Sequence, residues 1–301
     1  MTRYRRKFHR IARRLTNLEL QYGSDSGDSF SMEGVLDDLT SSRGSEFFMG
    51  FYSEQGIRLA FEKFGICKEL SKLGYDDLII TTDTRDQYRQ LLRLYDRKKD
   101  AQHMLGELVV HKAQFTYKRK SLLPRHFYPL KMIYVEWLVL QDPKGEFSEK
   151  KPQLPGQEYP GLGIGPQILE LMYLMAKNQR TQGILIVPHY YHTAVIFSRE
   201  FKFINPEYQA ILKRVEQDLS DYSLPVRAWG VECGAVYKKY DNKRFDWEPE
   251  EQILACDKSL RQYLHSPDYI NRVQDASKKH AFYLDTERLK QNLPANIELK
   301  F

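Results

Sequence analysis

The sequence predicts an α/β protein with a mixed α+β fold, in which helices flank a central mixed β-sheet. Two observations carry this prediction. Short runs of β-branched and other apolar residues alternate with segments whose apolar residues recur at helical spacing. In addition, the apolar run 184–187 directly follows a helical segment and is typical of a buried central strand. The 301 residues, 42% of them hydrophobic, suffice for a sizeable core.

The first 22 residues predict a basic amphipathic helix. Residues 1–20 hold seven basic residues and one acidic residue, and this surplus of +6 equals the net charge of the whole chain. Apolar residues recur at helical spacing between the arginines, at Tyr4, Phe8, Ile11, Leu15 and Leu18. Such a helix can bind an anionic membrane surface, nucleic acid or a protein partner, dock on its own chain, or present a solvated face that binds nothing. These alternatives stay open. Residues 23–29 are small and polar throughout, and they predict a flexible linker that extends loosely to residue 45.

The main domain is predicted for residues 46–245, and a C-terminal extension with short helices for residues 246–301. The first half of the main domain is predicted to contain a helix at 56–75 broken near Gly65, a strand at 77–82, a helix from Asp83 or Thr84 to Tyr95, and strands at 104–117 and 130–141. Its second half is predicted to contain a helix at 165–182, a strand at 184–187, a further helix, a helix at 206–219 and closing strands within 225–240. Short helices are predicted at 260–263 and 269–282 in the extension.

A glycine turn opens the helix predicted at 165–182. Gly161, Gly163 and Gly165 alternate there, so the backbone can adopt positive φ and approach a ligand closely. The first free amides of the helix point into the same space and suit a pyrophosphate. A tight turn into a core helix is the alternative. Pro166 stands where the dinucleotide fingerprint needs its third glycine, and the Gly-Lys-Ser/Thr of a P-loop is missing, which argues against those two classes.

Two further sets of residues are candidates for chemistry. Glu136 interrupts the otherwise apolar strand at 130–141, so its carboxylate is either paired with a basic neighbour or has a raised pKa suited to proton transfer. His189, Tyr190, Tyr191 and His192 follow the strand at 184–187, at the end where ligands bind in open α/β sheets. They are expected to contact a cofactor, move a proton or line an acceptor pocket, or else to pack against the next helix.

The stretch from about 132 to 204 resembles the GNAT superfamily of acyl-CoA-dependent N-acetyltransferases. Gly163-Ile164-Gly165 matches the Gly-x-Gly/Ala of that family, the run 184–187 matches its next strand, and three later apolar positions are filled by Ala194, Phe197 and Phe203. The departures are Pro160 for Gln/Arg, Tyr191 for Asn, Ser198 for Tyr and Lys202 for Gly. The runs WLVLQDP, PGLG and PHYYH also resemble a group of uncharacterised bacterial GNAT-like proteins.

The resemblance implies a cofactor, acetyl-CoA or another acyl-CoA, and a small-molecule or peptide amine as acceptor. The pyrophosphate would be held by Gly161, Leu162, Gly163, Ile164, Gly165 and Pro166. The end of the strand that carries Leu138 would receive the pantetheine arm, and Glu136 would be the general base. One or more of His189, Tyr190 and His192 would also handle protons. Family members often use the Tyr that Ser198 replaces as general acid on the departing thiolate.

Other classes fit the composition less well. The three cysteines are far apart with no CxxC pair, which argues against a disulfide framework or a structural zinc site, and His189 and His192 have no carboxylate at metal-ligand spacing. No apolar run approaches the ~18 residues of a membrane span, and the start lacks the apolar core of a secretory signal. A cytoplasmic location is therefore expected. A mitochondrial transit peptide fits the scarcity of early acids but not the absence of serine from residues 1–20.

The resemblance thus implies an acyl-CoA-binding protein that transfers an acetyl group from acetyl-CoA to an amine. The alternative is a catalytically silent sensing or assembly module, whose basic tail binds a membrane surface, nucleic acid or a protein partner. A dedicated nucleic-acid binder fits less well, because the chain after residue 20 has as many acidic as basic residues.

Overall fold

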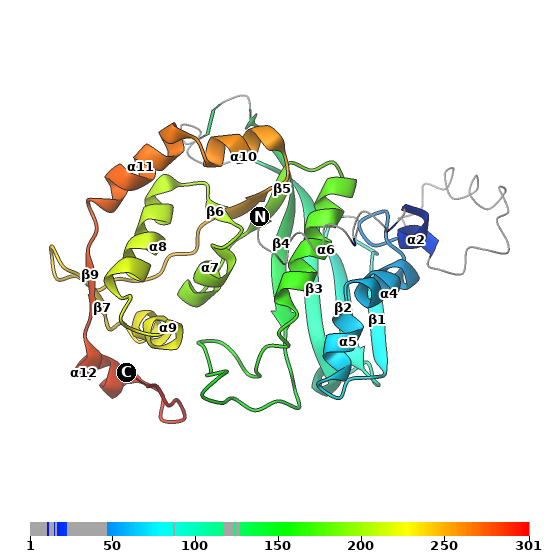
Figure 1. Cartoon of the computed structure of the whole chain (residues 1–301), viewed down its shortest axis with the longest axis horizontal. Helices are drawn as coiled ribbons and strands as arrows, with labels where there is room; N and C mark the ends of the chain where they lie inside the picture. Colours follow the sequence, from blue (N-terminus) through cyan, green and yellow to red (C-terminus); the bar gives the residue numbers. More distant parts are fainter. Residues whose placement is uncertain are drawn as a thin grey trace. The chain divides into compact units, whose positions relative to one another are not determined.

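The structure, a computed structural model, describes residues 11, 15, 17–22, 47–86, 88–116, 123–124 and 127–300. Most of the predicted basic helix and the predicted linker at 23–45 lie outside the described residues. The chain divides into two compact units: Met1–Lys112, Ile133–Lys144 and Gly161–Gln179 form the first, and Ala113–Met132, Gly145–Pro160 and Arg180–Phe301 form the second. Each unit combines a β-sheet with helices, which confirms the predicted mixed α+β fold class (Figure 1).

The first unit is built on four neighbouring strands in the order β1-β2-β3-β4. Its elements in chain order are α2 (Asn17–Tyr22), α4 (Glu54–Lys63), α5 (Ile66–Ser71), β1 (Leu78–Asp83), β2 (Gln90–Asp96), the 3₁₀ helix η1 (Ala101–His103), most of β3 (Met104–Phe115) and of β4 (Leu130–Leu140), and α6 (Gly165–Asn178). The predicted break at Gly65 is confirmed, since this residue has φ +76° and separates α4 from α5.

The helix predicted from Asp83 or Thr84 to Tyr95 is wrong, because β2 occupies Gln90–Asp96. This strand pairs antiparallel with β1, with Leu78 opposite Asp96 and Asp83 opposite Leu91. Its residues alternate strictly between buried and half-buried, which is the period of a strand and not of a helix. The expected strand-then-helix opening of the domain is therefore a β-hairpin. Pairing with β1 and β3 outweighs the helical spacing of the apolar residues in this segment.

Helices α2, α4 and α6 cover one face of the first unit's sheet. A small apolar cavity of about 70 Å³ remains between the helices and the strands. It is lined mainly by Leu20, Ile57, Phe61, Leu92, Leu94, Leu108, Leu138, Leu140, Ile168, Leu171 and Met175. At the contact of α2 with α4, a Cβ on Gly56 would lie only 1.8 Å from the carbonyl oxygen of Leu20, so only glycine permits this approach.

The second unit contains three neighbouring strands in the order β5-β8-β6 and the separate antiparallel pair β7-β9. Its elements in chain order are β5 (Gly183–Ile186), α7 (Tyr191–Phe197), β6 (Lys202–Phe203), α8 (Pro206–Asp218), α9 (Leu224–Glu232), β7 (Val236–Lys238), β8 (Gln252–Ala255), α10 (Lys258–Leu264), α11 (Pro267–Ser277), β9 (Phe282–Leu284) and α12 (Thr286–Asn292). The predicted strand at 184–187 and the helices predicted after His192, at 206–219 and at 260–263 are confirmed.

Two predictions for the second unit need correction. The closing strands expected within 225–240 are mostly the helix α9, with only β7 as a strand, because Pro225 in the first turn favours a helix start. The extension at 246–301 also supplies β8, which the sequence analysis missed. All four residues of β8 are buried, and the strand pairs antiparallel with both β5 and β6. The predicted helix at 269–282 ends at Ser277, and β9 follows it.

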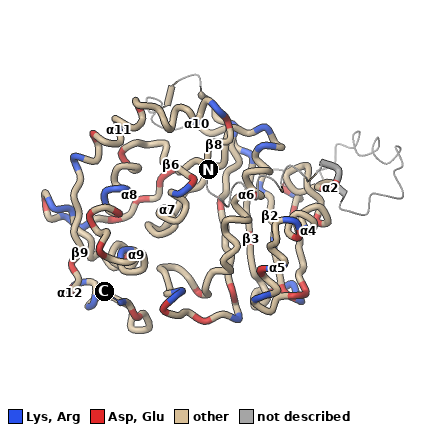
Figure 2. Tube along the Cα trace, in the orientation of Figure 1, with Lys and Arg blue, Asp and Glu red and all other residues tan. Residues whose placement is uncertain are grey.

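Basic and acidic residues are interspersed along the described parts of both units (Figure 2). Among the described residues, we find no helix that combines the length and the apolar character needed to cross a membrane.

Candidate functional site

The glycine turn lies in the first unit and leads directly into α6, which begins at Gly165. The apolar residues between the glycines anchor the turn, since Leu162 is 4% exposed and Ile164 is fully buried. The three glycines between and beside them are exposed. Gly163 has φ +76°, a conformation that side-chain-bearing residues rarely adopt. The turn therefore presents backbone to the solvent while its apolar side chains hold it in place.

The space in front of this turn is open and contains free donors. A Cβ added to Gly163 or Gly165 would meet no atom within 4 Å. Ile164, the N-cap of α6, makes no side-chain capping bond, Pro166 has no N–H, and Gln167 donates to the carbonyl of Ile164 at 3.1 Å. In the part of the chain that the structure describes, the amides of Gly163, Ile164 and Gly165 have no acceptor. These amides and the helix dipole favour an anion at this position.

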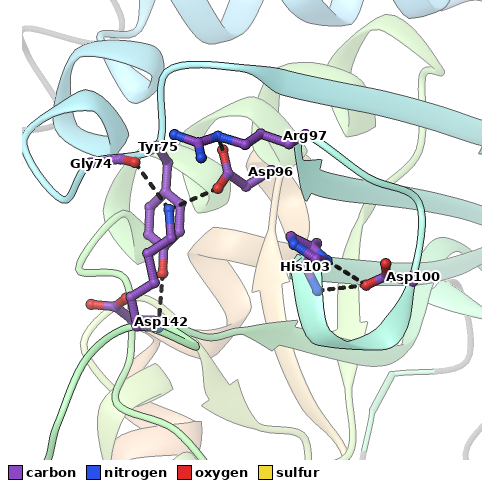
Figure 3. A network of polar contacts seen from close by, with 8 residues as sticks. Gly74, Tyr75, Asp96, Arg97, Asp100, His103 and Asp142 are labelled. Carbon is purple, nitrogen blue, oxygen red and sulfur yellow. Dashed lines mark hydrogen bonds and ion pairs between the residues drawn. The ribbon is translucent and has the colours of Figure 1, made fainter.

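A polar network fixes the end of β4, from which the chain departs toward the glycine turn (Figure 3). The Tyr75 hydroxyl donates to Asp142 at 2.5 Å and accepts from the amide of Lys144 at 3.2 Å. The Lys144 ammonium donates to Asp96 at 2.8 Å and to the carbonyl of Gly74 at 3.1 Å. Burial, together with the hydrogen bond to Asp142, raises the pKa of Tyr75, so it stays a neutral donor. The network ties the ends of β2 and β4 to the loop before β1.

Glu136 is paired with a basic neighbour, which decides between the two alternatives that the sequence left open. Its carboxylate accepts two hydrogen bonds from Arg89, at 2.8 and 3.1 Å. The Nδ1 atom of His111 lies 3.9 Å away, and the His111 ring packs edge-on against Tyr134 with centroids 4.8 Å apart. The Arg89 guanidinium holds the pKa of Glu136 below its usual range. The group is therefore ionised at neutral pH, as a proton acceptor must be, but its basicity is reduced.

Leu138 lies only two residues beyond Glu136, yet it has different surroundings. Leu138 and Leu140 line the apolar cavity under α6. Glu136 instead contacts His111. His111 lies in β3 next to Val110, which pairs with Gln90 of β2. Residues two apart in a regular strand share a face, so these contacts indicate an irregularity of β4 near the exposed Trp137. The structure thus does not bring Glu136 and Leu138 together.

His189, Tyr190 and His192 do come together, in a pocket of about 180 Å³ in the second unit. The lining residues are Pro155, His189, Tyr190, Tyr191, His192, Ala228, Val231, Glu232, Asp246 and Trp247. The Tyr190 ring stacks on His192 with centroids 5.4 Å apart, and Trp247 packs edge-on against Tyr191 at 5.7 Å. Gly156 lies so close to Tyr190 that a Cβ would approach its ring to 2.5 Å. The loop before the glycine turn therefore supports one wall of the pocket.

His192 and Tyr191 combine burial with unsatisfied polar atoms. His192 is 6% exposed, and burial lowers its pKa to about 4, so the imidazole is neutral at pH 7. Its buried Nδ1 atom has no hydrogen-bond partner among the described residues, and the same holds for the hydroxyl of Tyr191. Burial also raises the pKa of Tyr191. Buried polar atoms without partners are uncommon and are a feature of functional sites.

Ser198, at the position where the GNAT pattern has Tyr, is engaged locally. It follows the last residue of α7, and its hydroxyl donates to the carbonyl of Val195 at 2.7 Å. The apolar positions of the same pattern, Ala194 and Phe203, are fully buried. These positions thus serve packing in the second unit, and no tyrosine hydroxyl is supplied at residue 198.

Sequence reasoning missed Arg89, His111, Glu232 and Trp247 as neighbours of the candidate residues. Arg89 and Glu136 are 47 residues apart and meet through the β-sheet of the first unit. No local motif in the sequence marks this pair. The one available signal was the lone carboxylate in an apolar strand, which calls for a basic partner such as an arginine from a neighbouring strand. No cluster of three or more His, Cys, Asp or Glu suited to a metal is found within the described ranges.

The site of the first unit is thus an open glycine turn with free amides, and that of the second is an aromatic pocket with a neutral buried imidazole. No protein-family model matches the sequence, and a comparison with curated proteins gives no match either.

Proposed function

We propose that the chain binds acetyl-CoA or another acyl-CoA through the glycine turn and transfers the acyl group to an amine, as a GNAT-like N-acetyltransferase. The observation that carries the proposal is the turn itself: open space at Gly163 and Gly165, with free amides at the start of a 14-residue helix. Such a helix start suits the cofactor's pyrophosphate. The resemblance around Gly163-Ile164-Gly165 supports the same cofactor. Residues from Gly161 to Pro166 hold the pyrophosphate in this proposal, and the end of β4 with Leu138 holds pantetheine.

The transfer step needs one proton acceptor and one proton donor. The amine nitrogen attacks the thioester carbonyl, a C–N bond forms, the C–S bond breaks, the amine loses a proton and the thiolate of CoA gains one. Glu136, ionised beside Arg89, is the group that we propose as the proton acceptor. His189, Tyr190 and His192 belong to the second unit, and their part in proton transfer stays a prediction from the sequence.

Calorimetry with acetyl-CoA tests the cofactor proposal directly. A Gly163→Glu variant places bulk and negative charge where the pyrophosphate is proposed to lie. Gly65→Glu is a matched control, because Gly65 has the same φ of +76°, precedes a helix and has no atom within 4 Å of its Cβ position. Both variants therefore carry the same backbone strain, about 1–3 kcal/mol. We expect the parent and Gly65→Glu to bind and Gly163→Glu not to bind; absence of binding by the parent would refute the proposal.

A second candidate is acyl-CoA binding without transfer, in a sensing or assembly module. It is favoured by the Ser198 hydroxyl, which is committed to Val195, and by the reduced basicity of Glu136 beside Arg89. A panel of amines separates the candidates. Turnover that falls in Glu136→Gln supports transfer, whereas cofactor binding without turnover on any amine supports the silent module.

The proposal also covers the partners and the location. The acceptor is a small-molecule or peptide amine. The basic segment at 1–22 is assigned to an anionic partner, because it carries the whole net charge of the chain. A cytoplasmic location is proposed on the basis of three free cysteines, Cys67, Cys233 and Cys256, which suit a reducing compartment.

A further inference from the structure

The pocket of the second unit combines aromatic rings with acidic side chains. Tyr190, Tyr191 and Trp247 contribute the rings, and Glu232 and Asp246 contribute carboxylates. Among the described residues, no Lys or Arg lines it. With a volume of about 180 Å³, it has room for a small organic molecule of about ten non-hydrogen atoms.

Glu232 is placed unfavourably unless a cation is nearby. It is the last residue of α9, where the helix dipole disfavours negative charge. It is exposed, and its carboxylate has no hydrogen bond or ion pair in the described part of the chain. Asp246 is also exposed, and its only ion partner among those residues is Arg244, at 2.7 Å. In the described part of the chain, the Glu232 carboxylate therefore has no cationic partner, and the Asp246 carboxylate pairs only with the exposed side chain of Arg244.

His192 adds no positive charge to this pocket. Burial keeps its imidazole neutral at pH 7, and its buried Nδ1 atom lacks a partner within the described ranges. The Tyr190 ring is 36% exposed and stacks on His192, so its orientation is supported from the protein side. Trp247 is fixed by the hydrogen bond from its Nε1 atom to the carbonyl of Pro188, at 3.1 Å. Rigid aromatic faces beside carboxylates are the chemistry that recognises organic cations.

We propose that this pocket binds a protonated amine, with its ammonium group beside Glu232 and Asp246 and its carbon body against Tyr190 and Trp247. This binding does not depend on the function proposed above, because all the lining residues belong to the second unit.

The test compares two probes of equal shape, 2-phenylethylamine and 2-phenylethanol, which differ in charge at pH 7. Each is titrated into the full chain at low ionic strength, without acetyl-CoA, and binding is followed by calorimetry and tryptophan fluorescence. We expect the amine to bind about tenfold tighter than the alcohol, because only the cation gains from the carboxylates and the ring faces. Glu232→Gln and Asp246→Asn are each expected to weaken amine binding about two- to fivefold and to leave alcohol binding unchanged.

Matched variants make the result specific. Glu298→Gln removes an exposed carboxylate elsewhere in the same unit and is expected to change nothing. Trp247→Phe is expected to remove the fluorescence response, whereas Trp137→Phe, in the first unit, is expected to retain it. Equal affinity for amine and alcohol, or indifference to both carboxylate variants, overturns the proposal.

The two proposals fail separately. Gly163→Glu is expected to lose acetyl-CoA binding and to bind the amine probe as the parent does. Amine binding by a protein that does not bind acetyl-CoA supports the cation pocket and refutes the acyltransferase. Acetyl-CoA binding without amine selectivity supports the cofactor site and refutes the pocket.

Discussion

Replacing Gly165 by Glu should stabilise the protein but weaken cofactor binding, and these opposite responses are the sharpest test of the glycine turn. Gly165 is the first residue of α6, its φ is not in the left-handed region, and a Cβ there would meet no atom within 4 Å. Exchanging Gly for Glu in a helix gains roughly 0.5 kcal/mol of propensity. A carboxylate in the first turn adds about 0.3–1 kcal/mol through the helix dipole. The variant should therefore be about 1 kcal/mol more stable than the parent.

The same carboxylate should compete with the pyrophosphate for the free amides. At about 5 Å in a water-like medium, each phosphate charge would be repelled by about 0.8 kcal/mol, so two charges weaken binding by at least about tenfold. Gly165→Gln is the matched control, because it gains the propensity without the charge and should lose less affinity. Thermal unfolding without ligand measures the first effect and calorimetry with acetyl-CoA the second. Undiminished binding by Gly165→Glu would refute the phosphate site, and a less stable variant would refute the described geometry of the turn.

Three further predictions concern stability. The Asp96 side chain is 2% exposed, and Lys144→Met leaves it with Arg97, at 3.9 Å, as its one ion partner among the described residues. This variant should cost about 2 kcal/mol in denaturant unfolding, whereas Lys72→Met, at an exposed position, should cost at most about 0.5 kcal/mol. Burial lowers the pKa of His192 to about 4, so as the pH falls from about 6.5 to 4 this histidine takes up a proton in the unfolded state but not in the folded state. The free energy of unfolding of the parent should therefore fall by about 3 kcal/mol over this range. His192→Gln should not show this loss when denaturant unfolding is measured against pH. Gly56→Ala should displace α2 and accelerate chymotryptic cleavage within it, whereas Gly165→Ala should leave the digestion pattern unchanged, since its Cβ has room.

Local patterns were sufficient where an element is determined by its own residues. Helix α6, strand β5 and the break at Gly65 follow from spacing and glycine placement, and they were predicted. Strands β2 and β8 depend on neighbours that lie elsewhere in the chain. The apolar residues of β2 fit a helix as well as a strand, and only the antiparallel partners β1 and β3 select the strand. β8 consists of four residues in a polar region, and its burial comes from β5 and β6.

The candidate site divides in the same way. The glycine turn was visible because three glycines at alternate positions require a special backbone whatever surrounds them. The environment of Glu136 was not visible, because its partners Arg89 and His111 reach it from other segments. The pocket around His189 to His192 was located from the end of β5, but Glu232 and Trp247 come from α9 and from the segment before β8. The preference for a cation that we propose for this pocket therefore depends on tertiary structure.

The start of α6 gives the strongest physical reason to expect an anion there. Among the described helices of ten or more residues, α4, α8 and α11 begin with side-chain caps from Ser53, Asn205 and Ser266. Such caps satisfy amides that a helix start leaves without partners, and removing one costs about 1 kcal/mol. Helix α6 forgoes this stabilisation, with Ile164 at its N-cap and exposed glycines on both sides. Ile164 is also fully buried, so a Ser at this position would gain about 1 kcal/mol from capping but lose more from the missing apolar side chain. Gly165→Glu leaves Ile164 in place, so undiminished acetyl-CoA affinity in that variant would show that the uncapped start serves packing and no ligand.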